Sequence, residues 1–287
     1  HSETAFAAMQ ENSERNTSDN RLSLSKEEAT TFLENSNGFD YIDIDPFGSP
    51  NPLLDVACRR LARGGILAVT ATDTGALAGS FVNAGRMKYW AENKKSPQKH
   101  ELGLRILARK VMLMGMQHAK ALQPILSYHY EHYYRIFFRC TKGKQRAAAL
   151  YAQTTATHFV CEKCGNQGPY TPACPQCQHP QQQLGPVYGG KLQDEQLCTT
   201  LCEKFPEFKK LLTPLLLDDH IEQVGFFDTH EICKHSKLPL CKVSVLVEKL
   251  QEKGFLAAQS AFEKTGCTTN AKLQEVFSCL RQTPETQ

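Results

Sequence analysis

Residues 40–50 read Asp-Tyr-Ile-Asp-Ile-Asp-Pro-Phe-Gly-Ser-Pro. The apolar and β-branched residues of this stretch predict a buried strand, which ends where an acid is followed by Pro, an aromatic residue and Gly. In an open α/β sheet, an acid at the carboxyl end of a strand faces the ligand crevice. The stretch therefore predicts an α/β fold with Asp45 at such a crevice, although Asp-Pro is also a common boundary between a strand and a turn.

The residues that follow continue this pattern. The segment 52–63 has the apolar periodicity of a helix, and residues 65–72 form a second apolar run that ends in Thr72-Asp73-Thr74. Strand, helix and strand in this order are typical of a doubly wound sheet. Residues 76–96 contain Gly, Asn and Lys, and we expect a loop-rich insertion that lies over the crevice.

A helix and a hairpin are predicted next. Residues 101–117 have a helical pattern with apolar and basic faces, and the apolar runs at 125–130 and 133–140 are too close together for a helix between them. They must form an antiparallel hairpin. A parallel sheet closed by such a hairpin is typical of the Rossmann-like sheet of class I methyltransferases. The predicted fold class is α/β, with this sheet followed by a smaller α+β domain.

Four of the twelve cysteines form a regular pattern. Cys161 and Cys164 make one CxxC pair, Cys174 and Cys177 make a second, and nine residues separate the pairs. Two such knuckles can surround one tetrahedral Zn(II) with four thiolates, which would leave no open position for water. The zinc is therefore predicted to be structural, with a redox role for the pairs as the alternative. Without a secretory signal, this cysteine usage indicates a reducing compartment rather than disulfides.

The bulk composition is that of a globular protein with room for two domains. The chain has 287 residues, a hydrophobic content of 41% and a formal net charge of +3, and no apolar run is long enough to span a bilayer. A mildly basic balance permits a nucleic-acid partner without requiring one. Each basic cluster alone is typical of a solvated face, but together they predict a phosphate-facing surface on the first half. The clusters are Arg59, Arg60 and Arg63; Lys88, Lys94, Lys95 and Lys99; Arg105, Arg109 and Lys110; and Lys142, Lys144 and Arg146.

The C-terminal half is predicted to be a second domain. Residues 141–149 are basic and Ala-rich, so the domains are placed at 1–148 and 149–287. Helix, helix, Gly and strand near the end of the chain resemble a winged helix, which is a common nucleic-acid module, although a plain packing domain fits equally well. The predicted helices are 195–204, 207–217, 228–234 and 241–253, and the predicted strand is 255–258.

The ordered motifs resemble those of the tRNA (guanine-N2)-dimethyltransferases that act at position 26, the junction of the D and anticodon arms. The matching phrases cover nearly the whole chain. They are residues 43–50, 69–74 with 77–79, 100–107, 227–230, and 254 through 266. The resemblance implies a class I methyltransferase that uses S-adenosylmethionine to methylate guanine N2 in tRNA, once and then again. An acid, a Pro and an aromatic residue at this strand end are shared by enzymes that methylate exocyclic amino groups of bases.

The resemblance also assigns roles to residues of the opening stretch. Asp45 corresponds to the family's catalytic acid, which would hold the N2 hydrogens, favour a more pyramidal nitrogen and accept the proton. The carbonyl of Pro46 would share this work, and Phe47 would stack on the flipped base. Because the amine must approach the sulfonium methyl in line, positioning is expected to be the main catalytic contribution.

Glu28 and Ala29 stand where the family has an Asp-Ala pair that binds the cofactor. The acid would accept from the adenine amino group and the following N–H would meet a ring nitrogen, although Glu lengthens the reach. A structural alternative is a capping box, with Ser25 as N-cap and Glu28 completing it. The resemblance places a glycine-containing cofactor loop and a ribose-binding acid on earlier strands. The chain is therefore predicted to be N-terminally truncated and to carry half of the cofactor site.

Two further functions stay open at this point. A non-catalytic, zinc-containing tRNA-binding fragment would need only the zinc unit, the basic surface and the winged-helix-like segment. An amino-methyltransferase that acts on DNA or protein would share the acid-Pro-aromatic signature. The predicted partner is tRNA, with no membrane and no protein partner. The expected location is the cytoplasm in a prokaryote, with the nucleus or the mitochondrion as options in a eukaryote.

Overall fold

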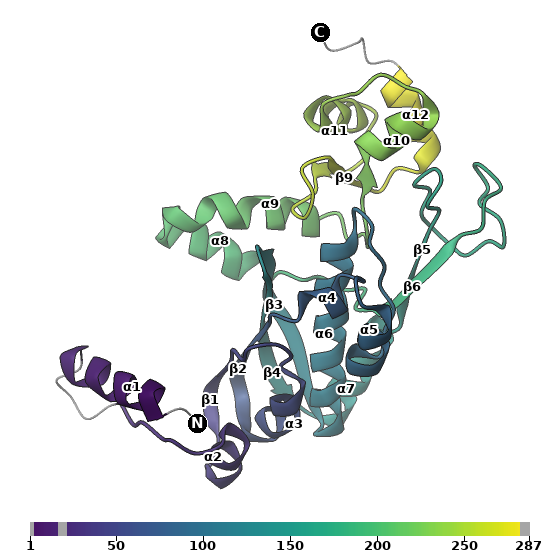
Figure 1. Cartoon of the computed structure of the whole chain (residues 1–287). Helices are drawn as coiled ribbons and strands as arrows, with labels where there is room; N and C mark the ends of the chain where they lie inside the picture. The colour runs from purple at the N-terminus through teal and green to yellow at the C-terminus, as the bar shows by residue number, and fades with distance from the viewer. Residues whose placement is uncertain (1–2, 17–21, 282–287) are drawn as a thin grey trace.

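A four-stranded mixed sheet organises the first half of the chain (Figure 1). The computed structural model describes residues 3–16 and 22–281. Strands β1 (Phe39–Ile44) and β2 (Leu61–Ala71) are parallel. Strand β4 (Tyr133–Lys142) is antiparallel to β2 and to β3 (Lys120–Tyr130), and the order across the sheet is β1-β2-β4-β3. The predicted α/β fold, the parallel pair and the antiparallel hairpin are confirmed.

Helices alternate with these strands. They are α1 (Glu3–Asn16), α2 (Ala29–Asn35), α3 (Asn51–Arg60), α4 (Thr74–Leu77), α5 (Val82–Tyr89), α6 (Lys99–Gln117) and α7 (Lys144–Tyr151). The helices predicted at 52–63 and 101–117 are confirmed as α3 and α6, with small shifts at their ends. The loop-rich insertion predicted at 76–96 is wrong in part, because α5 lies within it. Burial of Tyr89 against the rest of the chain stabilises this short helix more than its local sequence suggests.

The core of the first half lies between the sheet and α6. Alternate side chains of β4 face α6, and Tyr134, Ile136 and Phe138 are fully excluded from solvent. Each such burial of a large apolar side chain contributes about 1.5–3 kcal/mol. A Cβ on Gly103 of α6 would lie 2.8 Å from the Tyr134 hydroxyl oxygen, so the close approach of helix and sheet requires glycine here.

The second half contains smaller sheets. Strands β5 (Ala156–Val160) and β6 (Gln182–Val187) form an antiparallel pair. A three-stranded antiparallel sheet has the order β7 (Phe227–Asp228), β9 (Gly266–Thr269) and β8 (Ala257–Gln259). In Figure 1, α8 and α9 form a hairpin beside the upper end of the sheet, and α10, α11 and α12 gather around β9.

Four of the five α-helices in the described part of the second half were predicted from the sequence, and α12 was not. They are α8 (Glu195–Lys204), α9 (Lys209–Asp219), α10 (Thr229–Ser236), α11 (Val243–Glu252) and α12 (Leu273–Arg281), with short 3-10 turns at Ala152–Thr154 and Pro206–Phe208. Each of the predicted helices from 195 to 253 matches α8, α9, α10 or α11 within a few residues, and the predicted strand is β8. Across the described residues, no helix has both the length and the apolar character needed to cross a membrane.

A buried ion pair on α6 joins the two halves. Arg105 Nε donates to Glu101 Oε1 at 2.8 Å, and the two side chains are only 6% and 3% exposed. The remaining partners are backbone groups of a later segment. Arg105 donates to the carbonyls of Tyr188 (3.1 Å), Gly190 (2.9 Å) and Gln223 (3.1 Å), and Glu101 accepts from the N–H of Gly225 (3.0 Å). We call this set of contacts the Arg105 latch, and it fixes segment 188–225 against α6.

Part of the predicted basic surface is wrong, because two of its residues are buried. Arg105 is 5% exposed and Lys110 is 6% exposed, so neither side chain faces a phosphate. The Lys110 ammonium lies 3.0 Å from the centroid of the Trp90 ring, which is a cation–π contact. Burial, followed by the nearby Arg109 charge, lowers the pKa of Lys110 to about 8. These two cations therefore stabilise the packing of α6.

Candidate active site

The loop after β1 is bound to the end of β2. The Gly48 N–H donates to Thr72 Oγ1 at 2.6 Å, and the Thr72 N–H donates to the Gly48 carbonyl at 3.0 Å. Gly48 has a φ of 98°, a left-handed conformation that favours glycine. The two strand ends that the sequence placed at the crevice therefore meet. We call residues 45–50 the β1 loop.

Asp45 and Phe47 are the exposed members of the β1 loop. The Phe47 side chain is 108% exposed, and Asp45 is also exposed. Within the described part of the chain, the Asp45 carboxylate has no hydrogen-bond or ion-pair partner. A free carboxylate can accept N–H donors, and an exposed aromatic ring offers a stacking face. The predicted residues Asp45, Pro46 and Phe47 thus lie together on one accessible loop.

Asp43, two residues before Asp45, forms a salt bridge with an arginine of β4. Arg135 donates from Nη1 to Asp43 Oδ1 at 3.0 Å and from Nη2 to Asp43 Oδ2 at 2.7 Å. The same guanidinium donates to Thr70 Oγ1 at 2.5 Å, and the Tyr41 hydroxyl donates to Asp43 Oδ2 at 3.0 Å. A bidentate pair of this kind fixes both side chains. It connects β1, β2 and β4 and leaves Asp45 as the acid that is free for chemistry.

Tyr89 supports the β1 loop from α5. Its hydroxyl donates to Asp73 Oδ1 at 2.5 Å and lies 3.1 Å from Ser49 Oγ. Burial, followed by the hydrogen bond to Asp73, raises the pKa of Tyr89. Lys88 Nζ lies 3.3 Å from the other Asp73 oxygen, and Asn51 Nδ2 donates to the Lys88 carbonyl at 2.9 Å. The sequence did not predict this network, because the local pattern of α5 does not indicate that Tyr89 contacts Asp73 and Ser49.

Glu28 caps the N-terminus of α2. Its Oε2 accepts the Thr30 N–H at 2.8 Å and also contacts the Thr30 hydroxyl, and these hydrogen bonds lower the pKa of Glu28. Glu28 is therefore itself the N-cap, and the alternative in which it completes a capping box begun by Ser25 is wrong. Ser25 instead donates to Glu27 Oε1 at 2.7 Å. Ala29 is the first residue of α2, where a backbone N–H has no partner within the helix.

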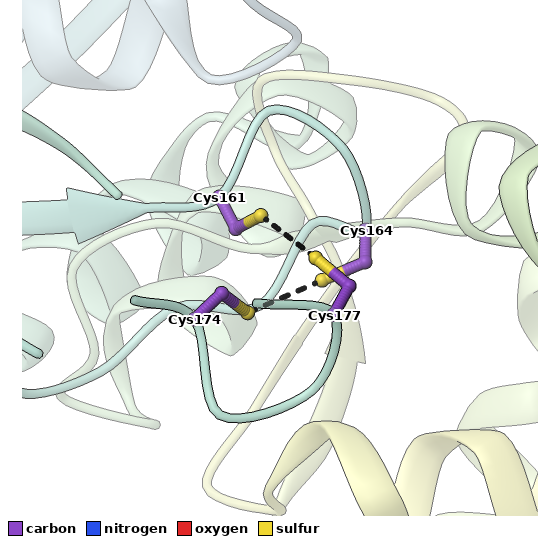
Figure 2. Close-up of side chains that lie close together, drawn as sticks. All are labelled: Cys161, Cys164, Cys174 and Cys177. Atoms are coloured by element: carbon purple, nitrogen blue, oxygen red, sulfur yellow. Dashed lines mark hydrogen bonds between the residues drawn. The ribbon is translucent and has the colours of Figure 1, made fainter. Parts of the chain in front are cut away.

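The four predicted metal ligands lie together. Figure 2 shows that the sulfurs of Cys161, Cys164, Cys174 and Cys177 point toward one common centre, and all of them lie within 4.8 Å of one another. Two of the separations are 3.4 Å (Cys161 to Cys177) and 3.5 Å (Cys164 to Cys174). Tetrahedral Zn–S bonds of about 2.3 Å place sulfurs about 3.8 Å apart, so the cluster has the right size for one zinc ion.

A buried polar network connects the cysteine unit to α6. Gln98 donates to Gln167 Oε1 at 2.8 Å and to the Phe226 carbonyl at 2.6 Å, and the His158 Nε2 lies 2.7 Å from Gln98 Oε1. Burial, followed by the nearby Arg105, lowers the pKa of His158 to about 4, so the imidazole is neutral at pH 7. A hollow of about 770 Å³ is lined by His158, Gln167 and Phe227, among others, and lies away from the β1 loop.

The chain matches one protein family along nearly its whole length. A family model described as N2,N2-dimethylguanosine tRNA methyltransferase matches residues 1–281. The chain is 35% identical to the tRNA (guanine(26)-N(2))-dimethyltransferase of Methanobrevibacter smithii, over 91% of this chain and 71% of the relative. It is 31% identical to the tRNA (guanine(26)-N(2)/guanine(27)-N(2))-dimethyltransferase of Aquifex aeolicus, over 98% of this chain and 74% of the relative.

A solved structure supports the same similarity. The structure of Trm1 from Pyrococcus horikoshii in complex with S-adenosyl-L-methionine matches this chain with a TM-score of 0.84 and 27% sequence identity. The match covers 98% of this chain and 80% of the other. The likeness therefore includes both halves of the chain.

Proposed function

Since this chain belongs to the N2,N2-dimethylguanosine tRNA methyltransferase family, we propose that Asp45 is the catalytic acid of its reaction. That reaction is the S-adenosylmethionine-dependent dimethylation of guanine N2 at position 26 of tRNA. One observation supports this role above the others. The Asp45 carboxylate is exposed on a loop fixed to Thr72, and it has no partner in the described residues, whereas the neighbouring Asp43 is bound by Arg135.

Asp45 acts on a weak nucleophile. The lone pair of guanine N2 is delocalised into the ring, so a carboxylate that accepts hydrogen bonds from the N2 hydrogens makes the nitrogen more pyramidal and takes up its proton. We propose that the Pro46 carbonyl accepts the second hydrogen. Phe47, with its fully exposed ring, stacks on the extruded guanine. The contacts of Gly48 and Ser49 with Thr72 and Tyr89 hold these groups in place before the base arrives.

Glu28 and Ala29 are proposed to hold the adenine of S-adenosylmethionine, which supplies an electrophilic methyl group when it is bound. Only Oε2 of Glu28 is engaged by Thr30, so Oε1 is available to accept from the adenine amine. The Ala29 N–H at the start of α2 is available to donate to a ring nitrogen. The residues present therefore fit this part of the cofactor.

Cys161, Cys164, Cys174 and Cys177 are proposed to hold one structural Zn(II). The close approach of the four sulfurs supports this assignment, and thiolate ligands suit zinc. Four protein ligands leave no position for water, so the ion contributes to folding rather than to methyl transfer. Gln167, which follows the first knuckle, accepts a hydrogen bond from Gln98, the residue directly before α6, and so connects the zinc unit to the start of that helix.

The finer architecture is part of the same proposal. The sheet β1-β2-β4-β3 corresponds to the carboxyl-terminal half of a Rossmann-like class I methyltransferase sheet. The units after residue 148 form a zinc-containing, winged-helix-like domain that recognises tRNA. The arrangement of α10, α11, β8 and β9 supports the winged-helix comparison. Residues 184–192 nevertheless contribute Leu184, Val187 and Tyr188 to the core around the first sheet.

Methylation of tRNA transcripts tests the role of Asp45. Full-length protein and labelled S-adenosylmethionine are used, and D45N is compared with D40N, which alters an acid at the other end of the same strand. We expect kcat to fall at least about 100-fold in D45N, the usual contribution of a positioned proton acceptor, and to stay near the wild-type value in D40N. Equal rates for D45N and the wild type would remove Asp45 from the mechanism.

Competition among substrates tests the alternatives. Unlabelled tRNA, duplex DNA and protein are each added to the labelled reaction, and we expect only tRNA to compete. Competition by DNA or protein would favour an amino-methyltransferase of another class. Tight tRNA binding by calorimetry, without any methyl incorporation or binding of S-adenosylmethionine, would favour a non-catalytic binding fragment.

A further inference from the structure

Three tyrosines gather at the end of the β3–β4 hairpin. Tyr128, Tyr130 and Tyr133 flank the tight turn at Glu131 and His132, in which Glu131 has a φ of 45°. The ring centroids of Tyr128 and Tyr133 are 6.2 Å apart, and those of Tyr130 and Tyr133 are 6.1 Å apart. Tyr130 is 52% exposed. We call these three residues the tyrosine tip.

The tyrosine tip lies at the same edge of the sheet as the β1 loop. In the β2–β4 ladder, the last pair is Ala71 opposite Tyr134, so Thr72, which follows β2 directly, lies near Tyr133. Thr72 in turn is hydrogen-bonded to Gly48 of the β1 loop. Neighbouring strands are about 4.8 Å apart, and the sheet order is β1-β2-β4-β3. Tyr133 on β4 is therefore two strand spacings, about 10 Å, from the line of β1, and Tyr130 on β3 is three spacings, about 14 Å, from it.

The tip also lies on the same face of the sheet as Asp43 of β1. Side chains alternate along a strand, and Arg135, which shares a face with Tyr133, binds Asp43. Asp45 comes directly after the end of β1, two residues beyond Asp43. Tyr134, between Tyr133 and Arg135, is buried on the opposite face against α6. Tyr128 is paired with Arg135, and Tyr130 is paired with Tyr133, so the three tyrosines lie on the face of the sheet that carries Asp43.

The turn end of the hairpin packs against α6. On the α6 side, the His100 and His129 rings stack at 3.9 Å, and His100 Nδ1 lies 3.1 Å from the Tyr134 hydroxyl oxygen. Burial, followed by the nearby His129, lowers the pKa of His100 to about 4, so the His100 ring is neutral at pH 7. A preformed aromatic surface loses little conformational entropy when a base stacks on it.

A cation stands beside the tip. The exposed Lys210 of α9 lines, with Tyr128 and His129, a small hollow of about 150 Å³. Proteins that bind unpaired nucleotides combine aromatic rings that stack on bases with nearby lysines or arginines that neutralise phosphates. Both features occur here two to three strand spacings from an acid that must receive an extruded guanine.

We propose that the tyrosine tip, with Tyr130 as its exposed ring, is the stacking platform for an unstacked nucleotide of the tRNA next to the target guanine. This inference rests on the proposed function and assigns part of its substrate-binding surface. Extrusion of guanine 26 leaves its neighbours without a stacking partner. The tip replaces that partner and so holds the strand while Asp45 engages the flipped base.

Steady-state methylation of a tRNA transcript tests this role with three variants of Tyr130. Stacking needs an aromatic ring but not the hydroxyl, so Y130F is expected to keep the wild-type KM for tRNA. Y130A and Y130L are both expected to raise that KM about tenfold, which is within the range for loss of one base–aromatic contact. The matched control is Y151A, because Tyr151 is 55% exposed and lies on α7, which joins the opposite end of β3 and β4.

Further measurements separate the outcomes. The Kd for S-adenosylmethionine and the thermal midpoint are measured for every variant, and both are expected to match the wild type. If wild-type protein methylates tRNA and the KM of Y130A stays within twofold of that of Y151A, the tyrosine tip is not a tRNA platform. An equal loss in Y130F and Y130A would also overturn stacking. Failure of the wild-type protein to methylate tRNA would instead overturn the proposed function.

Discussion

Removal of the Arg105 side chain should destabilise the whole chain. R105M leaves the Glu101 carboxylate buried without its cation, and three backbone carbonyls, of Tyr188, Gly190 and Gln223, lose their donor. Breaking a buried ion pair by removing one partner costs about 3–5 kcal/mol. The total free energy of unfolding of a domain is only about 5–15 kcal/mol, so the loss is a large fraction of it.

Urea denaturation of the zinc-loaded protein measures this loss. The fluorescence of Trp90, the only tryptophan in the chain, and the far-ultraviolet circular dichroism signal follow unfolding. With a slope of about 3 kcal/mol per M, the expected loss moves the midpoint down by about 1–1.7 M urea. R105K keeps the charge but not the planar set of donors, so we expect about half of the loss.

A neighbouring arginine provides the control. Arg109 lies one helical turn further along α6, is only partly buried and donates to two carbonyls, that of Thr154 at 2.7 Å and, in a longer contact, that of Trp90 at 3.4 Å. R109M should therefore cost about 1–2 kcal/mol, the net value of one short and one long hydrogen bond. A loss for R105M no greater than that for R109M would refute the reasoning that the latch stabilises the contact between the two halves.

Three shorter predictions address the loop, a buried acid and the metal. Y89F removes the hydroxyl that contacts Asp73 and should lower kcat about fivefold to tenfold with an unchanged KM for tRNA, and an unchanged kcat would show that the contact does not position the β1 loop. Burial, followed by nearby Glu101, raises the pKa of Asp218 to about 7 from 3.8, so the folded chain binds more protons than the unfolded chain between these values. The free energy of unfolding should therefore fall as the pH rises from about 4 to 7. Urea denaturation at several pH values should show that D218N has lost this pH dependence. An unchanged pH dependence in D218N would contradict the raised pKa of Asp218. C177S should reduce the zinc content, measured by atomic absorption, from one ion per chain to near zero and lower the thermal midpoint, and retention of full zinc content would argue against this ligand set.

Local sequence patterns predicted most of the elements of the fold. The β3–β4 hairpin is an example, because two apolar runs separated by two residues have no other way to pair. The helix α5 was missed for the opposite reason. Its sequence contains Gly85 and no strong apolar stripe, and its stability comes from the burial of Tyr89 by residues distant in the sequence.

The candidate site divides in the same way. The cysteine cluster could be predicted, since each CxxC knuckle places two sulfurs locally and one spacing joins the knuckles. The contacts that position the loop of Asp45 could not be predicted from the sequence. Arg135 and Asp43 are 92 residues apart in sequence, and Gly48 and Thr72 are 24 apart, so only the register of the sheet brings them together. A motif indicates the proposed reacting group, whereas the groups that position it depend on the completed fold.

Asp43, in β1, and Asp45, directly after β1, differ in whether the fold leaves the carboxylate without a partner. Asp43 and Asp45 have the same chemistry and are two residues apart, and two nearby carboxylates repel each other. The bidentate Arg135 compensates the charge of Asp43 and fixes it in the sheet, while the β1 loop turns away after Asp45 and leaves its carboxylate exposed. Arg135 follows Tyr133 and Tyr134 directly, so the residue that neutralises Asp43 also anchors the hairpin that carries the tyrosine tip. The charge balance at the reacting acid and the position of the proposed nucleotide platform therefore depend on the same strand register.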